Sequence, residues 1–124
     1  MIHTMHLYEE PFELIKSGIK TIEIRLYDEK RRKIDLNDMI IFQKLPDNGE
    51  VIKCTVVGLS RFGTFTELLS AFDKANLGHP GNITPEEQLN RQYKIYSKEE
   101  ERINGVLGIH LRLEDGSYDN AQKA

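Results

Sequence analysis

The segment from Ile19 to Leu26 most constrains what this chain can fold into. Isoleucine or leucine stands at every second position from 22 to 26, and glutamate or arginine stands between them. Because successive side chains of an extended chain point to opposite faces, this alternation predicts a β-strand with one apolar face and one polar face. Gly18, just before it, is suited to ending a helix. We therefore expect a short helix that leads into a strand with charged groups on one face.

The polar face of this strand is a candidate binding site. Glu23 and Arg25 lie two residues apart, close enough to pair or to present an acceptor and a fork of donors to a planar polar ligand. Lys20 falls on the same strand face as the apolar residues, not on the face of Glu23 and Arg25. The local geometry at Gly18 can nevertheless direct its ammonium toward Glu23 and Arg25. A solvent-exposed ion pair worth roughly 0–1 kcal/mol explains the same spacing. The spacing alone leaves both interpretations open.

The rest of the chain predicts strands followed by helices and a closing strand. Strands are expected over residues 2–7, 39–45, 50–59 and 106–113, and a short helix opens at Glu10-Pro11. Segment 50–59 is largely apolar on both faces, so we expect it to be covered on both sides. Three later helices are expected to begin at Thr64, Thr84 and Ser97, because each is followed three residues on by a glutamate.

Length and composition indicate one globular domain, expected over residues 1–113, with a frayed polar tail over 114–124. Hydrophobic residues make up 39% of the 124 residues and charged residues 30%, and no apolar run approaches a membrane span. The first residues lack the pattern of a secretory signal. Cys54 is the single cysteine and is expected to be a buried, inert thiol. We expect a cytoplasmic protein with no metal or other cofactor, because the four histidines match no recognised ligand spacing.

Positive charge is concentrated beside the candidate site. The stretch from Gly18 to Lys33 holds six basic and three acidic residues, although the whole chain has a formal net charge of -3. This balance argues against coating of nucleic acid through bulk electrostatics and favours a local basic patch that includes Arg31 and Arg32. A solvated turn explains such a run equally well.

The sequence G-I-K-T-I-E-I-R, with the later D-L-N-D-M-I-I-F, resembles the signature of the ASCH domain, a branch of the PUA-like superfamily. The residues that match this signature are Gly18, Lys20, Glu23, Arg25 and Asp38. Asn37 replaces a glycine of the family pattern, and asparagine tolerates the left-handed turn that such a glycine adopts. The resemblance implies an α+β fold, a small PUA-like mixed β-barrel with helices packed at one side, and a cleft beside the strand that carries the motif.

The resemblance most directly implies a binding module for RNA or a nucleotide-sized ligand. Lys20 and Arg25 would then meet phosphate or a base edge, Glu23 would accept from an exocyclic amine, and Arg31 and Arg32 would contact the backbone. Two further candidates for the cleft are Arg61, which surface solvation also explains, and Tyr96, which would either stack on a base or pack at a helix junction.

Two other functions stay open at this point. Some small ASCH proteins hydrolyse the acyl group of N4-acetylcytidine with a lysine, a threonine three residues later and a distant glutamate. Lys20 matches the lysine, but Glu23 stands at the threonine's position and the nearby Thr21 is offset from it by two residues. A catalytic pair would therefore have to be Lys20 and Glu23, with a ribonuclease as a further option. The eligible distant glutamates are Glu86, Glu87, Glu99 and Glu100. The third function is an adaptor whose polar face contacts a protein; the sequence does not fix the oligomeric state.

Overall fold

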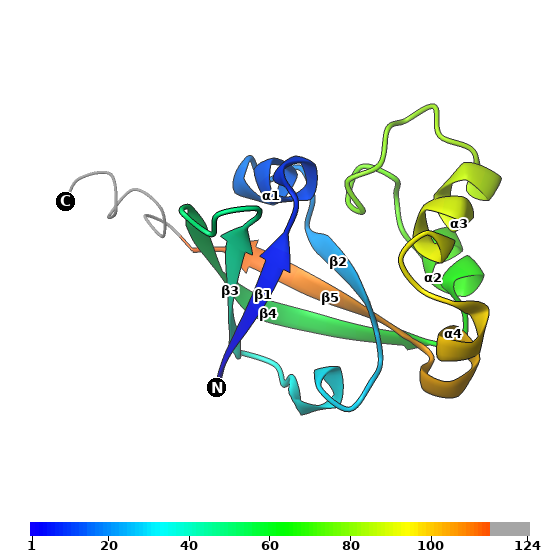
Figure 1. Ribbon diagram of the computed structural model, residues 1–124, viewed down its shortest axis with the longest axis horizontal. Coiled ribbons are helices and arrows are strands. Elements are labelled where there is room, and N and C mark those ends of the chain that lie inside the picture. The colour runs from blue at the N-terminus through cyan, green and yellow to red at the C-terminus, as the bar shows by residue number, and fades with distance from the viewer. Residues whose placement is uncertain (115–124) are drawn as a thin grey trace.

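One curled five-stranded sheet organises the chain (Figure 1). The computed structural model describes residues 1–114. The elements, in chain order, are β1 (Ile2–Leu7), α1 (Glu9–Lys16), β2 (Ile22–Leu26), the 3₁₀ helix η1 (Arg31–Lys33), β3 (Met39–Lys44), β4 (Val51–Phe62), α2 (Phe65–Ala71), α3 (Pro85–Tyr93), α4 (Lys98–Asn104) and β5 (Val106–Leu113). This arrangement confirms the expected α+β class. Of the expected tail over 114–124, Glu114 is described and its N–H donates to the Lys53 carbonyl, and residues 115–124 lie outside the described residues.

The strand order leaves the half-barrel open along one seam. The strands follow the order β1-β3-β4-β5-β2, in which β1 and β3 are parallel and the other neighbours are antiparallel. The two edge strands are therefore β1 and β2. An edge strand presents unpaired backbone donors and acceptors along its free side, so the seam between β1 and β2 is the part of the sheet most available for binding.

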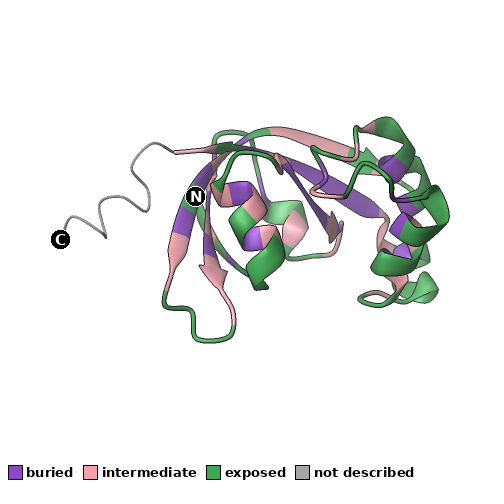
Figure 2. Cartoon of the chain, turned by 90° about the horizontal axis from the view of Figure 1, so that it is seen from above, coloured by how far each residue is buried: buried purple, intermediate pink, exposed green. Residues whose placement is uncertain are grey.

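Two hydrophobic clusters hold this sheet and its helices together. The first includes Phe12 of α1 and Phe42 of β3, and the second includes Phe65 and Leu68 of α2 packed against β2 and β5. All four of these side chains are fully buried, and each contributes about 1.5–3 kcal/mol through its removal from water. Buried residues follow the middle of the strands, whereas the turns and outer helix faces are exposed (Figure 2). The clusters fix α1 and α2 on either side of β2.

The three expected helix starts are confirmed. Thr84 and Ser97 form complete capping boxes with Glu87 and Glu100. The Thr64 hydroxyl accepts from the backbone N–H of Glu67 and donates to that residue's carboxylate, so the reciprocal backbone bond is absent there. These caps satisfy helix N–H groups that have no partner within the helix.

The ends and the coverage of two strands differ from expectation. β2 begins at Ile22, because the N–H groups of Ile19 and Lys20 both donate to the Leu14 carbonyl and belong to the turn after α1. β4 extends to Phe62, and the expectation that it is covered on both sides is wrong. Ile52, Cys54 and Val56 are buried, but Lys53 and Val57 on the opposite face are exposed, so apolar content on both faces does not mean burial of both.

The turn at Asn37, before β3, adopts the left-handed conformation expected from the sequence. Asn37 has φ +72°, in the left-handed region that the substituted glycine would favour. The buried Asp38 carboxylate accepts from the backbone N–H of Asp35 and hydrogen-bonds the His3 ring. The hydrogen bond with His3 and the Asp35 N–H hold the pKa of Asp38 well below its usual range. This carboxylate therefore joins the turn to β1.

The structure bears on two expectations from the sequence, a buried inert Cys54 thiol and the lack of a membrane span. Cys54 is free and buried, and burial raises the pKa of its thiol to about 12, which makes it unreactive. Within residues 1–114, none of the helices has the length and apolar character needed to cross a membrane.

Candidate ligand-binding cavity

A cavity of about 340 Å³ lies at the open seam of the half-barrel. Its wall comes from the end of β1, from α1, from Lys20 and β2, from the loop after α2, and from α3 with the residues that follow it. The aliphatic part of the wall includes Leu7, Leu14, Leu77 and Ile95, and the charged part includes Lys20, Glu23, Arg25 and Arg91. This volume and this mixture of apolar surface with a few polar groups are typical of small-molecule sites.

Three charged groups of the motif converge on this cavity. Glu23 is only 5% exposed, and its two carboxylate oxygens are held separately: Lys20 Nζ lies 2.9 Å from Oε1 and Arg25 Nε lies 2.7 Å from Oε2. The Glu23–Arg25 ion pair is therefore not exposed to solvent. Because two cations surround one anion, this cluster carries a net positive charge and retains N–H donors for a ligand.

The electrostatics keep Glu23 ionised. Burial acts to raise the pKa of its carboxyl, but the charges of Lys20 and Arg25 and their hydrogen bonds outweigh burial and hold the pKa below its ordinary value. A carboxylate with a lowered pKa, and with both oxygens already paired, is a weak proton acceptor. Glu23 is therefore better placed to orient the two cations than to act as a base.

Arg25 also connects the two edges of the sheet. Its Nη2 donates to the backbone carbonyl of His6 in β1, at 3.2 Å, while its Nε donates to Glu23 in β2. One guanidinium thus spans the seam, and its planar fork fixes the spacing between strands that do not pair with each other.

The loop between α2 and α3 covers Lys20. Leu77, Gly78 and His79 line the cavity. His79 Nδ1 lies 3.0 Å from the amide nitrogen of Gln88. Burial and the nearby charges of Arg91 and Lys20 lower the pKa of His79 to about 4, so its ring is neutral at pH 7. Since the Gln88 amide nitrogen is a donor, Nδ1 accepts and Nε2 carries the proton, which leaves His79 one free N–H.

Tyr96 packs at the helix junction, one of the two uses considered for it, and also lies on the cavity wall. It lines the cavity, and its ring stacks on Phe65 with 5.7 Å between centroids and 20° between planes. Burial raises the pKa of its hydroxyl. One part of the ring is therefore a packing surface of the second hydrophobic cluster, and another part belongs to the cavity wall.

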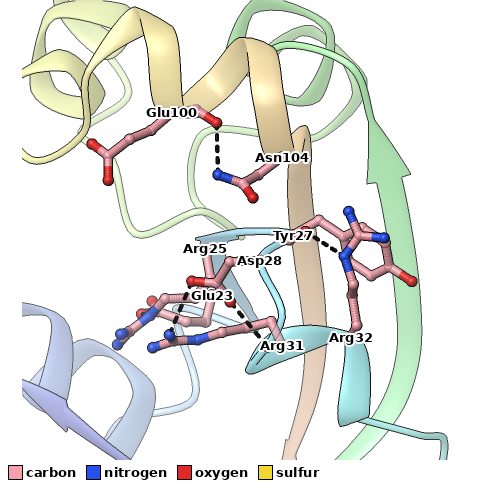
Figure 3. Close-up of polar contacts among 8 residues, drawn as sticks. All are labelled: Glu23, Arg25, Tyr27, Asp28, Arg31, Arg32, Glu100 and Asn104. Atoms are coloured by element: carbon pink, nitrogen blue, oxygen red, sulfur yellow. Dashed lines mark hydrogen bonds and ion pairs between the residues drawn. The ribbon is translucent and has the colours of Figure 1, made fainter.

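The other basic candidates lie outside the cavity wall. Arg31 is held by Asp28, and the side chains of Arg31 and Arg25 point to the same side of β2, away from Tyr27 and Arg32 (Figure 3). The guanidiniums of Arg32 and Arg61 lie 4.6 and 4.1 Å from the centre of the Tyr27 ring. Both are exposed, and so they form a separate positive surface, which we call the Tyr27 face.

Several residues considered for binding or catalysis do not reach the cavity wall. Gly18, a predicted ligand contact, and Thr21, a possible nucleophile, are not part of it. The same is true of the four distant glutamates considered from the sequence, Glu86, Glu87, Glu99 and Glu100, all of which are exposed. The neighbouring Glu101 is buried, but it accepts hydrogen bonds from the Tyr93 hydroxyl and the Phe65 N–H. No group of three metal-ligating side chains is found among residues 1–114.

The sequence did not identify the buried polar residues of α3. Gln88 and Gln92 are buried one helical turn apart, and Gln92 lines the cavity. Polar residues at this spacing normally mark a solvated helix face, so only their burial reveals them. His6 contributes a backbone carbonyl, for which no side-chain pattern exists.

Known proteins share this fold. A family model described as the ASCH domain matches residues 5–114. A crystal structure of the hypothetical protein PH0355 is 36% identical, with a TM-score of 0.80 over 92% of this chain and 100% of that one. The NMR structure of protein PF0455 from Pyrococcus furiosus is also 36% identical, with a TM-score of 0.70 over 93% and 99% of the two chains.

A more distant structure shares the fold alone. The crystal structure of ASCH from Zymomonas mobilis is 16% identical, with a TM-score of 0.57 over 90% of this chain and 66% of that one. No curated protein matches this chain. The match of the family model over most of the chain, together with relatives at 36% identity, establishes that this protein belongs to the ASCH domain family.

Proposed function

We propose that this protein binds RNA or a nucleotide-sized ligand in the cavity at the β1–β2 seam. The observation that carries the proposal is the buried cluster of Lys20, Glu23 and Arg25 on the wall of that cavity. Its two cations favour an anionic or electron-rich ligand, and its aliphatic wall favours a flat apolar surface. A nucleotide has both features, and the ASCH domain is associated with RNA binding.

The Tyr27 face supports an RNA rather than a free nucleotide as the physiological ligand. Arg32 and Arg61 are exposed and lie outside the cavity wall. Exposed arginines of this kind suit the phosphates of nucleotides that flank the one in the cavity. Such phosphate contacts position an RNA without reading its sequence. The single, buried cysteine suits a reducing compartment, and we place this binding function in the cytoplasm.

We favour binding over hydrolysis of an acylated nucleoside or cleavage of RNA. Both oxygens of Glu23 are engaged by cations, and Thr21 and the four distant glutamates do not line the cavity. A hydrolytic reaction needs a nucleophile or an activated water within about 3–3.5 Å of the reacting atom. The motif residues Lys20, Glu23 and Arg25 supply electrostatic stabilisation, and Glu23, with both oxygens paired and a lowered pKa, is poorly suited to removing a proton.

Thermal unfolding with nucleosides, nucleotides and short RNAs at two salt concentrations tests the proposal. A ligand that binds only the folded state raises the unfolding temperature by mass action, and phosphate contacts make that effect salt-dependent. We expect stabilisation by nucleotides in the wild type and its loss in Lys20→Met. The exposed Lys53 on β4 provides a matched control, Lys53→Met. Absence of stabilisation by every nucleotide and RNA at low salt would refute the proposal.

The same ligands distinguish the alternatives. Release of acetate from N4-acetylcytidine, abolished in Lys20→Ala and in Glu23→Gln, would establish hydrolysis instead. Binding of a protein partner without any nucleotide binding would establish the adaptor function.

A further inference from the structure

The hydrogen-bonding phase of β2 determines which of its backbone groups face the cavity. Leu111 N–H donates to the Thr21 carbonyl, and Tyr27 N–H donates to the Gly105 carbonyl. Hydrogen-bonded positions alternate along an antiparallel pair. In the register of β2 with β5, the backbone N–H and C=O groups of Glu23 and Arg25 therefore bond to β5. The backbone N–H and C=O of Ile24 point instead to the free edge of the sheet.

This free edge is short. Ile24 lines the cavity, although its side chain is buried in the second hydrophobic cluster. On one side of it, the outward N–H of Ile22 is occupied by the carbonyl of Asn76, and on the other side Leu26 is not part of the cavity wall. What remains is one donor and one acceptor on a single residue. An added peptide strand needs a longer row of such groups, but the edge of one planar ring does not.

Gln92 lies on the opposite wall without a partner. It is 6% exposed and lines the cavity from α3. Among residues 1–114, its side-chain amide has no hydrogen-bond partner, whereas its backbone carbonyl accepts from Ile95 and Tyr96. The amide is not one of the fully enclosed side-chain groups that lack a partner, so it opens onto the cavity. Its donors and its acceptor are therefore available to a ligand.

The free groups of the cavity include more donors than acceptors. Donors remain on Lys20, Arg25, Arg91, the His79 ring, the Gln92 amide nitrogen and the Ile24 N–H, whereas the acceptors are the Ile24 carbonyl, the Gln92 amide oxygen and the Glu10 carboxylate. Glu23 adds little acceptor capacity because its oxygens are already paired. A complementary ligand thus carries more acceptors than donors and also one donor–acceptor edge.

From this arrangement we propose that the cavity reads the hydrogen-bonding edge of a nucleobase, with the Ile24 backbone and the Gln92 side chain as the reading groups. The inference rests on the proposed function. Guanine, cytosine and uracil bear a carbonyl oxygen, which accepts two hydrogen bonds and so meets two of the cavity's donors at once, whereas each ring nitrogen of adenine accepts only one. The site is therefore a keto-base pocket that discriminates against adenine.

The test is calorimetric titration of the full chain with the four ribonucleoside 5′-monophosphates and with ribose 5-phosphate, which lacks a base. We expect the three keto-base nucleotides to bind at least about tenfold more tightly than the adenine nucleotide and ribose 5-phosphate, since each well-made base contact contributes about 1–3 kcal/mol of discrimination. In Gln92→Met, their affinity falls by about tenfold and that of ribose 5-phosphate does not change.

Two measurements separate reading of the base from a structural effect. Gln92→Met removes an amide that has no partner among residues 1–114, so its unfolding temperature stays close to that of the wild type. Gln43→Met makes the same change on β3, outside the cavity wall, and leaves all affinities unchanged. Lower stability of Gln92→Met with unaltered affinity ratios would show that Gln92 is structural and would overturn the inference.

The remaining outcomes tell the two proposals apart. If the nucleotides and ribose 5-phosphate bind equally in both proteins, the cavity holds phosphate and does not read a base; the proposed function stands and this inference falls. If the adenine nucleotide binds best, the inferred preference for bases with a carbonyl oxygen is wrong and this inference falls. If no nucleotide binds the wild type, the proposed function fails and this inference fails with it.

Discussion

Gly78 lies directly against the aliphatic stem of Lys20. A β-carbon at position 78 would stand 2.8 Å from Cδ of Lys20 and 3.3 Å from its Cβ. Gly78 also has φ +78°, a conformation that other residues adopt at a cost of roughly 1–2 kcal/mol. The loop between α2 and α3 thus holds the lysine that the motif supplies, and the absence of a side chain in the loop sets the position of its ammonium.

Replacement of Gly78 should therefore affect binding through Lys20. We expect Gly78→Ala to lose about 1–2 kcal/mol of unfolding free energy and to bind nucleotides more weakly, because the new methyl group displaces the stem of Lys20 from its present position. Urea denaturation and calorimetry measure the two effects. Gly81 is the control in the same loop, since a β-carbon there meets no atom within 4 Å and its φ is outside the left-handed region. Equal nucleotide affinity in Gly78→Ala and the wild type would contradict this account of the loop.

Glu23→Gln should destabilise the protein by about 3–5 kcal/mol at pH 7, because it leaves two buried cations without their counter-charge. The pKa of Glu23 is lower in the folded state than its ordinary value of 4.5. The stabilisation by its charge is therefore complete above pH 4.5 and is lost as the pH falls towards the folded pKa. Urea denaturation from pH 7 to pH 3 should show the two proteins converging.

The control for this experiment is Glu29→Gln, which removes an exposed carboxylate from the same stretch. It should change stability little, as surface substitutions usually do. A difference between wild type and Glu23→Gln that grows as the pH falls would contradict the assignment of a lowered pKa to Glu23.

His79 should stay neutral in the folded protein at pH values where a free histidine is already charged. Its pKa is about 4 in the folded state and 6.5 ordinarily, so the unfolded chain binds the proton first as the pH falls. Folding stability should decline between pH 6.5 and 4, and less so in His79→Asn. NMR titration of the imidazole resonances gives the pKa directly. A midpoint near 6.5 for His79 would show that its ring is not buried among cations as described.

The Tyr27 face should contribute to RNA affinity but not to nucleotide affinity. Arg32 and Arg61 lie outside the cavity wall, so Arg61→Ala should leave mononucleotide binding unchanged. For a short RNA it should lower the slope of log affinity against log salt by about 1. Arg112→Ala removes an exposed arginine near the far end of β5 and serves as the control. An unchanged salt slope in Arg61→Ala would remove phosphate contact from this face.

The sequence predicted the local features of the fold well. Alternation from position 22 to 26 identified β2, and three hydroxyl–glutamate pairs identified the starts of α2, α3 and α4. Each of these signals is local, because it depends on neighbouring residues within one element. Coverage of β4 was not predictable in this way, because it depends on where α1 and α2 pack.

The site was predictable only in part for the same reason. The sequence placed Glu23 and Arg25 on one face of a strand, and the fold brings that face to a cavity. Strand parity placed Lys20 on the other face, but Lys20 precedes the strand and is held by a loop distant in sequence. The His6 carbonyl, the Ile24 backbone and Gln92 meet only because β1 and β2 become the two edges of one sheet.

Amide chemical shifts measured during titration with a ribonucleoside monophosphate test the central claim most directly. If the seam cavity binds the ligand, the backbone amides of Ile24 and Gly78 and the side-chain amide of Gln92 shift together and saturate with one dissociation constant. Shifts confined to the Tyr27 face, with these three signals unmoved at saturation, would contradict the account.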